Sequence, residues 1–402
     1  MTTHRLPRAI PCLFLTALAA CGYFDPLQPP DPEPSDKSIT WQALLGGPGE
    51  DVACNVQETS DGGFILVGYT DSFGAGLADA WLVKTDASGV EEWSKTFGGT
   101  DEDWGACLQR TADGGYVLVG TTRSLGAGEE DVYLVKTDGS GELEWSSTFG
   151  GVEGDEGYCV QCTSDGGYIV SGLSHSFSEW SEIYLIKTNG GGLEQWSKTF
   201  GGSFGDCGYC VRQTDDDGYV VAGLSQSETG SVPSNIVDDA YLLKTDADGI
   251  EEWSNRFGRE YPDAGTCVEL TADGGYILAG YTRSYGAGDF NGWLIKTDAE
   301  GNEQWNRPYG ENTWDRFEGV QQTPDGGFIL VGMSRSWGPE GQAWLVKTDS
   351  VGDEEWSKFF VGNGDDWGLS VQQTSDEGYI LAGKTSSYGS GDFDAYLVYY
   401  KP

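Results

Sequence analysis

Seven aspartates recur along the chain at intervals of 52, 52, 51, 57, 52 and 51 residues, each four residues before a small side chain. A ring of such carboxylates is a candidate Ca²⁺ site, since Ca²⁺ takes several oxygen ligands, although ligand spacing of the EF-hand type is absent. Alternatively, each aspartate accepts backbone N–H bonds and fixes the start of the next element, which sevenfold repetition favours. The aspartates are Asp51, Asp103, Asp155, Asp206, Asp263, Asp315 and Asp366.

A second recurring set places an aromatic ring between serine and glycine or a polar residue, as in DSFGAG and RSYGAG. Aromatic side chains beside carboxylates suit stacking on a sugar or contact with a partner protein's basic side chains. Equally, the rings could fill gaps between structural units. The set comprises Phe73, Phe177, Tyr285, Trp337 and Tyr388. One equivalent segment, Gln226 to Asp239, is longer than the others and is the first place to look for specificity.

Cysteine and histidine limit the catalytic chemistry. Cys107, Cys159, Cys210 and Cys267 occupy one equivalent position in four consecutive units, where other units carry small residues, so we interpret them as buried small thiols. The pairs Cys159/Cys162 and Cys207/Cys210 have metal-like spacing, but residues three apart in a strand point to opposite faces. His175 is the only histidine beyond the amino-terminal segment, which excludes a multi-histidine metal site. It is also the one candidate for the base of a Ser-His-Asp catalytic triad.

The charge balance narrows the classes of partner. The chain has 402 residues, with 64 acidic residues against 23 lysines and arginines, a net charge of −41. Nucleic acid is therefore excluded as a direct partner, whereas cations and basic partners are favoured. Paired Asp and Glu residues could serve a glycosidase, but abundant acids do not show which two stand at a working separation. The acidity could also reflect a saline habitat, in which case it says nothing about partners.

Short β-strands are the elements that would position these residues. The turn TSDGGF returns in close variants with its aspartate at residues 61, 113, 165, 216, 273, 325 and 376. Each unit holds four strand-like segments, here called first to fourth; near Asp103 they read GACLQRT, GYVLVGTT, DVYLVKTD and LEWSSTFG. A lysine recurs in the third segment, and we expect it to pair with the glutamates that begin the fourth. Four antiparallel strands in about 50 residues is the format of a β-propeller blade.

Counting the segments predicts how the ring closes. Seven third segments occur, and the last, AYLVYYK, reaches the carboxyl terminus without a fourth segment after it. The missing partner is ITWQALLGG, residues 39–47, which matches EEWSKTFGG and places Trp41 among seven fourth-strand tryptophans. Closing the ring removes unpaired strand edges. We therefore predict an all-β, seven-bladed propeller of four antiparallel strands per blade, spanning residues 39–402, with residues 39–47 completing the last blade.

The repeat also carries a family resemblance. KTDASGVEEW resembles the tryptophan-docking repeat of quinoprotein-like propellers, and the whole unit resembles the DGGYILAG…WLVKTD…GxxxW repeat of secreted bacterial and archaeal proteins. The resemblance covers about residues 39–401 and implies the propeller fold. It does not extend to the quinone cofactor, because this chain lacks the vicinal cysteine pair of those dehydrogenases. The turn is also similar to the Asp-box of sialidases, without an assignable arginine triad.

The amino terminus is typical of an export signal. Basic residues precede an apolar stretch from Ala9 to Ala20 that is too short to span a bilayer. It ends in LAAC, which resembles the lipobox of bacterial lipoproteins, with residues 1–20 as signal peptide and Cys21 as the lipidated residue; an ordinary signal peptide is the alternative. Gly22 resembles the outer-membrane sorting choice of diderm bacteria. Residues 21–38 are Pro-rich and acidic, which predicts a disordered linker.

These expectations combine into one function and one alternative. In a propeller, the fourth-to-first and second-to-third connections share one face, called here the loop face, where the aspartates and aromatic rings would gather. We expect a lipid-anchored, monomeric binding platform for a protein, a glycan or a divalent cation, with no cofactor other than a candidate Ca²⁺. The alternative is an extracellular carbohydrate-active enzyme with Asp/Glu pairs in the central funnel. The sequence does not name the ligand.

Overall fold

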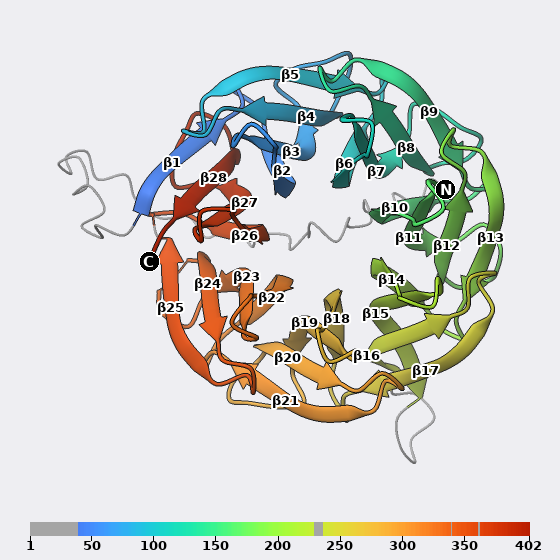
Figure 1. Cartoon of the computed structure of the whole chain (residues 1–402), viewed down its shortest axis with the longest axis vertical. Coiled ribbons are helices and arrows are strands. Elements are labelled where there is room, and N and C mark those ends of the chain that lie inside the picture. The colour runs from blue at the N-terminus through green and yellow to red at the C-terminus, as the bar shows by residue number, and fades with distance from the viewer. Residues whose placement is uncertain (1–38, 229–235, 339, 361) are drawn as a thin grey trace, which may run out of the picture.

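A computed structural model describes residues 39–228, 236–338, 340–360 and 362–402. The predicted signal peptide, the linker and Cys21 lie outside the described residues. Figure 1 shows the described chain as a closed ring of small sheets, viewed along its axis. None of its described segments is a helix of the length and apolarity needed to cross a bilayer.

Seven four-stranded antiparallel sheets make up the ring, which confirms the predicted fold. In six blades the strands follow sequence order from the innermost to the outermost. The blades are β2 (Asp51–Glu58), β3 (Phe64–Thr70), β4 (Asp79–Thr85), β5 (Glu91–Phe97); β6 (Asp103–Arg110), β7 (Tyr116–Thr122), β8 (Asp131–Thr137), β9 (Leu143–Phe149); β10 (Asp155–Cys162), β11 (Tyr168–Ser174), β12 (Glu182–Thr188), β13 (Glu194–Phe200); β14 (Asp206–Gln213), β15 (Tyr219–Glu228), β16 (Ile236–Thr245), β17 (Glu251–Phe257); β18 (Asp263–Leu270), β19 (Tyr276–Thr282), β20 (Asn291–Thr297), β21 (Glu303–Tyr309); and β22 (Asp315–Gln322), β23 (Phe328–Ser334), β24 (Gln342–Thr348), β25 (Glu354–Phe360).

The seventh blade combines both ends of the described chain. Its strands are β26 (Asp366–Gln373), β27 (Tyr379–Thr385), β28 (Asp394–Tyr400) and, outermost, β1 (Ile39–Leu45). The antiparallel register pairs Trp41 with Tyr399 and Leu45 with Ala395, so the predicted closure is confirmed. The strand ends at Leu45, two residues before the predicted end, because Gly46 turns the chain at φ +132° and the Gly47 N–H donates to Asp51.

The core lies between adjacent blades. Ile65, Val67 and Leu82 of the first blade, for example, pack against Leu118 and Val135 of the second. Each fourth-strand tryptophan is half-buried against the first aromatic ring of the next blade's second strand, with ring centroids 5.7 to 6.2 Å apart. Gly89 lies beneath Trp41, where a Cβ would come within 2.5 Å of the indole, and its φ of +81° also favours glycine. The tryptophans therefore join neighbouring blades.

The recurring lysines of the third strands are buried and make two kinds of ion pair. Lys84 Nζ lies 3.0 Å from Glu92 on the fourth strand, and equivalent pairs occur in three other blades, which confirms the predicted pairing. Lys84 Nζ also lies 3.1 Å from Asp61 in the turn between the first and second strands. This contact recurs at Asp113, Asp165, Asp216, Asp273 and Asp325. The turn aspartate therefore anchors the lysine as well as its own turn.

These turn aspartates predict acid sensitivity of the fold. A hydrogen bond from Thr59 lowers the pKa of Asp61 most, partial burial opposes it, and Gly63 N–H and Lys84 lower it further, from 3.8 to about 2. The equivalent donors hold the pKa of five other turn aspartates at about 2. Because a depressed folded pKa stabilises the fold above the unfolded value, this stabilisation is complete above about pH 4 and is lost towards about pH 2.

We therefore expect the melting temperature of the ring to fall as the pH is lowered from about 4 to about 2. Asp61→Asn should lower the melting temperature at neutral pH. It should also make the further decrease between about pH 4 and pH 2 smaller than in the unmodified protein. Asp248→Asn, at an exposed turn position, is the matched control. Differential scanning calorimetry at constant ionic strength measures both variants. Equal acid dependence of Asp61→Asn and the unmodified protein would contradict the assignment.

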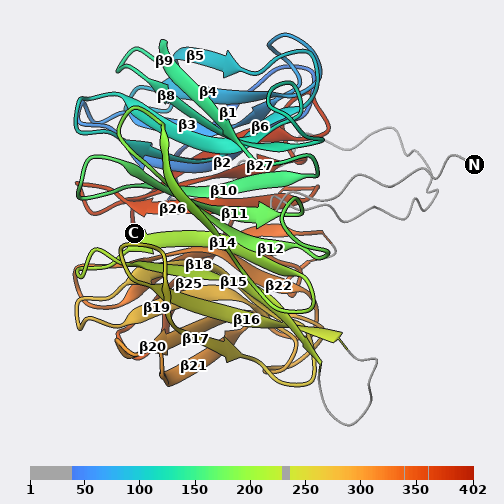
Figure 2. The ribbon, with the colours of Figure 1, turned by 90° about the vertical axis from the view of Figure 1, so that its right-hand side faces the viewer.

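The fourth blade departs from the others, as its sequence suggests. Strands β15 and β16 are ten residues long, and their register continues from Ser225 opposite Asp239 to Glu228 opposite Ile236. Much of the segment from Gln226 to Asp239, expected to be a long loop, is thus an extension of the hairpin. Residues 229–235 lie outside the described residues. Figure 2 shows β16 reaching beyond the ring on the side away from the label C.

Candidate functional site

The loop face is built on the seven aspartates that open the first strands. Each is at most 1% exposed. Asp263 accepts hydrogen bonds from the Arg259 N–H of its own loop and from the Arg283 and Ser284 N–H groups of the next loop of the same blade. The hydroxyls of Thr282 and Ser284 also donate to it. Its carboxylate therefore ties the two loops of one blade together.

The other aspartates of the set lie in equivalent places. The loop N–H four residues upstream donates to Asp51, Asp103, Asp155, Asp206 and Asp315. Serine or threonine hydroxyls donate to Asp51, Asp103, Asp155, Asp315 and Asp366. Within the described residues, no group of three or more Cys, His, Asp or Glu side chains is arranged to hold a metal ion. Cation binding by these aspartates stays a prediction, which melting in Ca²⁺ against matched monovalent salt tests.

The predicted aromatic rings lie on the loop face, between the second and third strands. Phe73, Phe177 and Trp337 are 47%, 53% and 57% exposed, whereas Tyr285 and Tyr388 are half-buried. Each also leans on an aromatic ring of the strands below, such as Phe73 on Trp81 at 6.2 Å and Tyr285 on Trp293 at 5.3 Å. The rings thus close the blade ends while leaving three large apolar surfaces in contact with solvent.

Two further aromatic residues that the sequence analysis did not single out share this face. Trp180 is 48% exposed in the third blade, and Tyr261 is 53% exposed in the loop that leads into the fifth. The Arg283 guanidinium lies 5.7 Å above the Tyr261 ring. Neither residue follows the Ser-aromatic-Gly pattern, so searching for that pattern misses them. A comparison of the units for loop residues that occur in one blade only would have found both.

The central channel is the second candidate site. The sequence predicted a central funnel but did not show which residues line it. A cavity of about 490 Å³ runs between the seven innermost strands, lined by three tiers of their side chains. One tier contains five glutamines, and a backbone N–H of the next blade's innermost strand donates to each of them, as Arg110 N–H does to Gln57. In the fourth and fifth blades this tier has Arg212 and Glu269 instead. Only there does the channel tier carry charge.

Two carboxylates line the channel, and each is held by an arginine. Glu269 Oε1 lies 2.6 Å from the Arg212 guanidinium, and Glu318 Oε1 lies 2.6 Å from that of Arg316. Burial raises the pKa of Glu318, and Arg316 opposes that rise. Neither carboxyl group is therefore presented alone to a substrate. The alternative of a carbohydrate-active enzyme stays a hypothesis, without a carboxylate pair that we can assign to it.

The remaining candidates lie apart from these groups. His175 is half-buried in the loop between the second and third strands of the third blade. Cys207 packs against Tyr158 near the channel, whereas Cys210, three residues on, faces Cys267, so the two thiols do not converge. Cys162 Sγ donates to the Arg110 carbonyl of the neighbouring blade.

Comparison with known proteins supports the fold and leaves the family open. No family model matches the chain, and no curated protein matches it in sequence. A structure from Dyadobacter fermentans, described as a protein of unknown function, is 12% identical with a TM-score of 0.52, covering 90% of this chain and 99% of its own. One from Bacteroides caccae, also of unknown function, is 13% identical with a TM-score of 0.45, covering 74% and 93%. YCF48 bound to D1 peptide is 12% identical with a TM-score of 0.49, covering 91% and 98%. At these identities the likeness concerns the β-propeller fold alone.

Proposed function

We propose that this seven-bladed propeller is a rigid binding platform whose loop face takes a protein ligand. The observation that carries the proposal is the distribution of exposed apolar side chains. The loop face exposes aromatic residues that differ from blade to blade, namely Phe73, Phe177, Trp180, Tyr261 and Trp337. Rigid aromatic anchors are enriched at the centres of protein interfaces.

The opposite face supplies the internal comparison. Its exposed apolar side chains are aliphatic and lie beside the turn between the third and fourth strands, with Val90, Leu193 and Ile250 directly after the turn glycine and Leu143 one residue further on. The loop face also exposes aliphatic side chains such as Leu77 and Val152, but the large exposed aromatic residues of the described ring all lie there, which favours this face for recognition.

Charge restricts the chemistry of the ligand. The chain carries a net charge of −41, and carboxylates such as Asp71, Glu129, Glu179 and Asp289 are exposed in or beside the loops that carry the rings. Basic side chains are attracted both by carboxylates and by the faces of aromatic rings. We therefore expect a peptide segment with Lys or Arg next to apolar residues. A glycan is the second candidate, since exposed rings also stack on sugars.

Selection on the folded domain tests this proposal. Residues 39–402 are screened against a displayed peptide library and a glycan array, each hit being remeasured by calorimetry. The variant Phe73→Ser/Phe177→Ser/Trp337→Ser should bind the selected ligand at least about tenfold more weakly, since each lost aromatic anchor costs about 1 to 2 kcal/mol or more. The matched control, Val90→Ser/Leu193→Ser/Ile250→Ser, changes equally exposed side chains on the opposite face. Equal loss in both variants, or loss in the control alone, would contradict the proposal.

Export and lipid anchoring through Cys21 form part of the same proposal. The support is the sequence Leu18-Ala19-Ala20-Cys21 after a short apolar stretch. A lipid chain at Cys21 would tether the ring to the cell envelope. Metabolic labelling with an alkyne fatty acid should mark the full chain and fail to mark Cys21→Ser, which should leave the membrane fraction. Unchanged fractionation of Cys21→Ser would contradict the anchor.

A further inference from the structure

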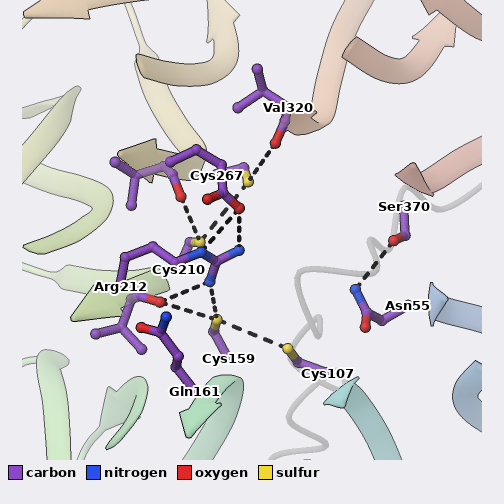
Figure 3. Close-up of polar contacts among 12 residues, drawn as sticks. Asn55, Cys107, Cys159, Gln161, Cys210, Arg212, Cys267, Val320 and Ser370 are labelled. Atoms are coloured by element: carbon purple, nitrogen blue, oxygen red, sulfur yellow. Dashed lines mark hydrogen bonds and ion pairs between the residues drawn. The ribbon is translucent and has the colours of Figure 1, made fainter. Parts of the chain in front are cut away.

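Four thiols form a row across adjacent blades inside the channel (Figure 3). Cys107, Cys159, Cys210 and Cys267 lie on β6, β10, β14 and β18 at one equivalent position. Cys107 Sγ is 3.9 Å from Cys159 Sγ, and Cys210 Sγ is 3.9 Å from Cys267 Sγ. The seven described cysteines are all present as thiols. The row therefore places pairs of reduced sulfur atoms in contact along the wall of the channel cavity.

Part of this arrangement is explained by the fold. Each thiol in the row lies 3.6 to 4.0 Å from a carbonyl oxygen of the next blade's innermost strand. At the same position in two other blades, Asn55 Nδ2 donates to Ser370 Oγ, whereas the sixth blade has Gly319 there. A small hydrogen-bond donor at this position thus links neighbouring strands. Serine would satisfy that role, so it does not explain why four consecutive blades carry sulfur.

Arg212 is the feature that the fold does not explain. It replaces the glutamine found at this tier in five blades, and its Nη1 lies 3.4 Å from Cys159 Sγ of the preceding blade. Glu269 fixes the guanidinium through hydrogen bonds of 3.0 and 2.6 Å to Nε and Nη2, and the Val211 carbonyl accepts a further bond from Nη1. The departure from the repeat therefore delivers a positively charged group to one thiol of the row.

The surroundings of Cys159 favour its thiolate form. Hydrogen bonds from the thiols of Cys107 and Cys210, together with the charge of Arg212, hold the pKa of Cys159 well below its ordinary value against the effect of burial. The same contacts and burial raise the pKa of Cys107 and Cys210. Of these three thiols, Cys159 is thus the one whose surroundings favour ionisation. The thiolate is the nucleophilic form of cysteine.

We propose that the channel is a peroxide-reactive thiol site, in which Cys159 is the oxidised nucleophile and Cys107 the resolving thiol. Cys159 gives up its proton, its sulfur attacks one oxygen of hydrogen peroxide, the O–O bond breaks, and the departing hydroxide takes up the proton that Cys159 released to become water. The sulfur of Cys107 then attacks the Cys159 sulfenic acid, the S–O bond breaks, and the Cys107 proton joins the departing hydroxide as a second water. Two thiols supply two electrons, one peroxide is reduced to two waters, and a disulfide joins β6 to β10.

The oxidant must be small. Cys159 is only 5% exposed and opens into a cavity of about 490 Å³. Hydrogen peroxide, close in size to two water molecules, can enter, whereas a protein disulfide cannot. This site lies on the ring axis and is independent of the ligand proposed for the loop face.

Single-turnover oxidation of the folded domain tests the proposal. Cys159 and Cys162 fall in one tryptic peptide, so the parent protein for the test carries Cys162→Ser. Hydrogen peroxide is added under anaerobic conditions, and the loss of free thiols is followed over time. The oxidised peptides are then identified by mass spectrometry. The parent should lose two thiols in one fast phase and yield a peptide pair linked through Cys107 and Cys159. Cys107→Ser should stop at a Cys159 sulfenic acid that dimedone captures.

The variant Arg212→Gln tests whether Cys159 reacts because Arg212 stabilises its thiolate or only because peroxide can reach it. Glutamine is the residue of five other blades at this position, so the fold should persist, and the melting temperature verifies that. The fast phase should slow about tenfold in Arg212→Gln, since the guanidinium no longer stabilises the thiolate, and it should vanish in Cys159→Ser. A fast phase that survives in Cys159→Ser, an unchanged rate in Arg212→Gln, or first oxidation at Cys54 or Cys207 would overturn the proposal.

Discussion

Removal of β1 should open the ring. A chain that begins at Gly46 lacks the outer strand of the seventh blade, including Trp41, which stacks on Tyr399 at 5.7 Å and also packs on Phe64 of the first blade. Loss of these contacts, of buried Leu45 and of the strand's hydrogen bonds should cost on the order of 5 to 10 kcal/mol. That is comparable to the whole stability of an ordinary domain, about 5 to 15 kcal/mol.

A chain that begins at Ile39 is the control, because it retains every described residue. Denaturant midpoints and light scattering distinguish the outcomes: the control should unfold cooperatively as a monomer, and the shorter chain should unfold early and associate through the exposed edge of β28. Among single substitutions, Trp41→Ala should be far more destabilising than Leu44→Ala, since Leu44 is 42% exposed on the same strand. Equal midpoints for the two chains would refute the closure.

Substitution of one buried loop aspartate should have the next largest effect. Asp263 is fully buried and accepts five hydrogen bonds, three from backbone N–H groups and two from hydroxyls. Asp263→Ala removes the acceptor that all five donors share and leaves the buried Thr282 hydroxyl to find another. The three N–H groups and the Ser284 hydroxyl keep second acceptors, such as the Pro262 carbonyl for Arg283 N–H. The free energy of unfolding should fall by about 2 to 3 kcal/mol, since leaving a buried polar group unsatisfied costs about 1 to 3 kcal/mol.

Asp289→Ala is the matched control, since Asp289 lies on the same face with its side chain 75% exposed. Its effect should be below about 0.5 kcal/mol, as for ordinary surface substitutions. Urea unfolding gives both values, and hydrogen exchange should show faster opening of the loops before β18 and after β19 in Asp263→Ala. A small effect of Asp263→Ala would show that the aspartate is not a structural anchor and would strengthen the cation hypothesis.

The architecture was predictable because its determinants are local and repeated. Turns such as Asp61-Gly62-Gly63 recur in five units and in close variants in the other two, and short strands of about seven residues recur in all of them, so the repeated units support one another's assignment. The closure followed from counting alone, since AYLVYYK lacks a fourth strand and residues 39–45 supply one. The structure added the contact between Lys84 and Asp61, which depends on the register of neighbouring hairpin strands.

The sites were less predictable because they depend on contacts between blades. The reach of Arg212 to Cys159 joins residues 53 positions apart on different sheets. A bulge in each innermost strand, as between Gly157 and Cys159, also shifts the alternation that sequence reasoning assumes. A signal was nevertheless present: Arg212 and Glu269 interrupt a series of five glutamines. In a repeat protein, comparing the units with one another distinguishes residues that every unit needs for its structure from residues that occur in one unit only.

Hydroxyl-radical footprinting of the ring with its selected ligand tests the central claim, that the blade frame is structural and recognition belongs to the loop face. The exposed side chains on both faces react with the radical, so each face reports on itself. Bound ligand should reduce oxidation of Phe73, Phe177 and Trp337 while leaving Leu193 and Ile250 unchanged. Protection of Leu193 and Ile250, with Phe177 and Trp337 still fully oxidised, would place recognition on the opposite face and contradict the account.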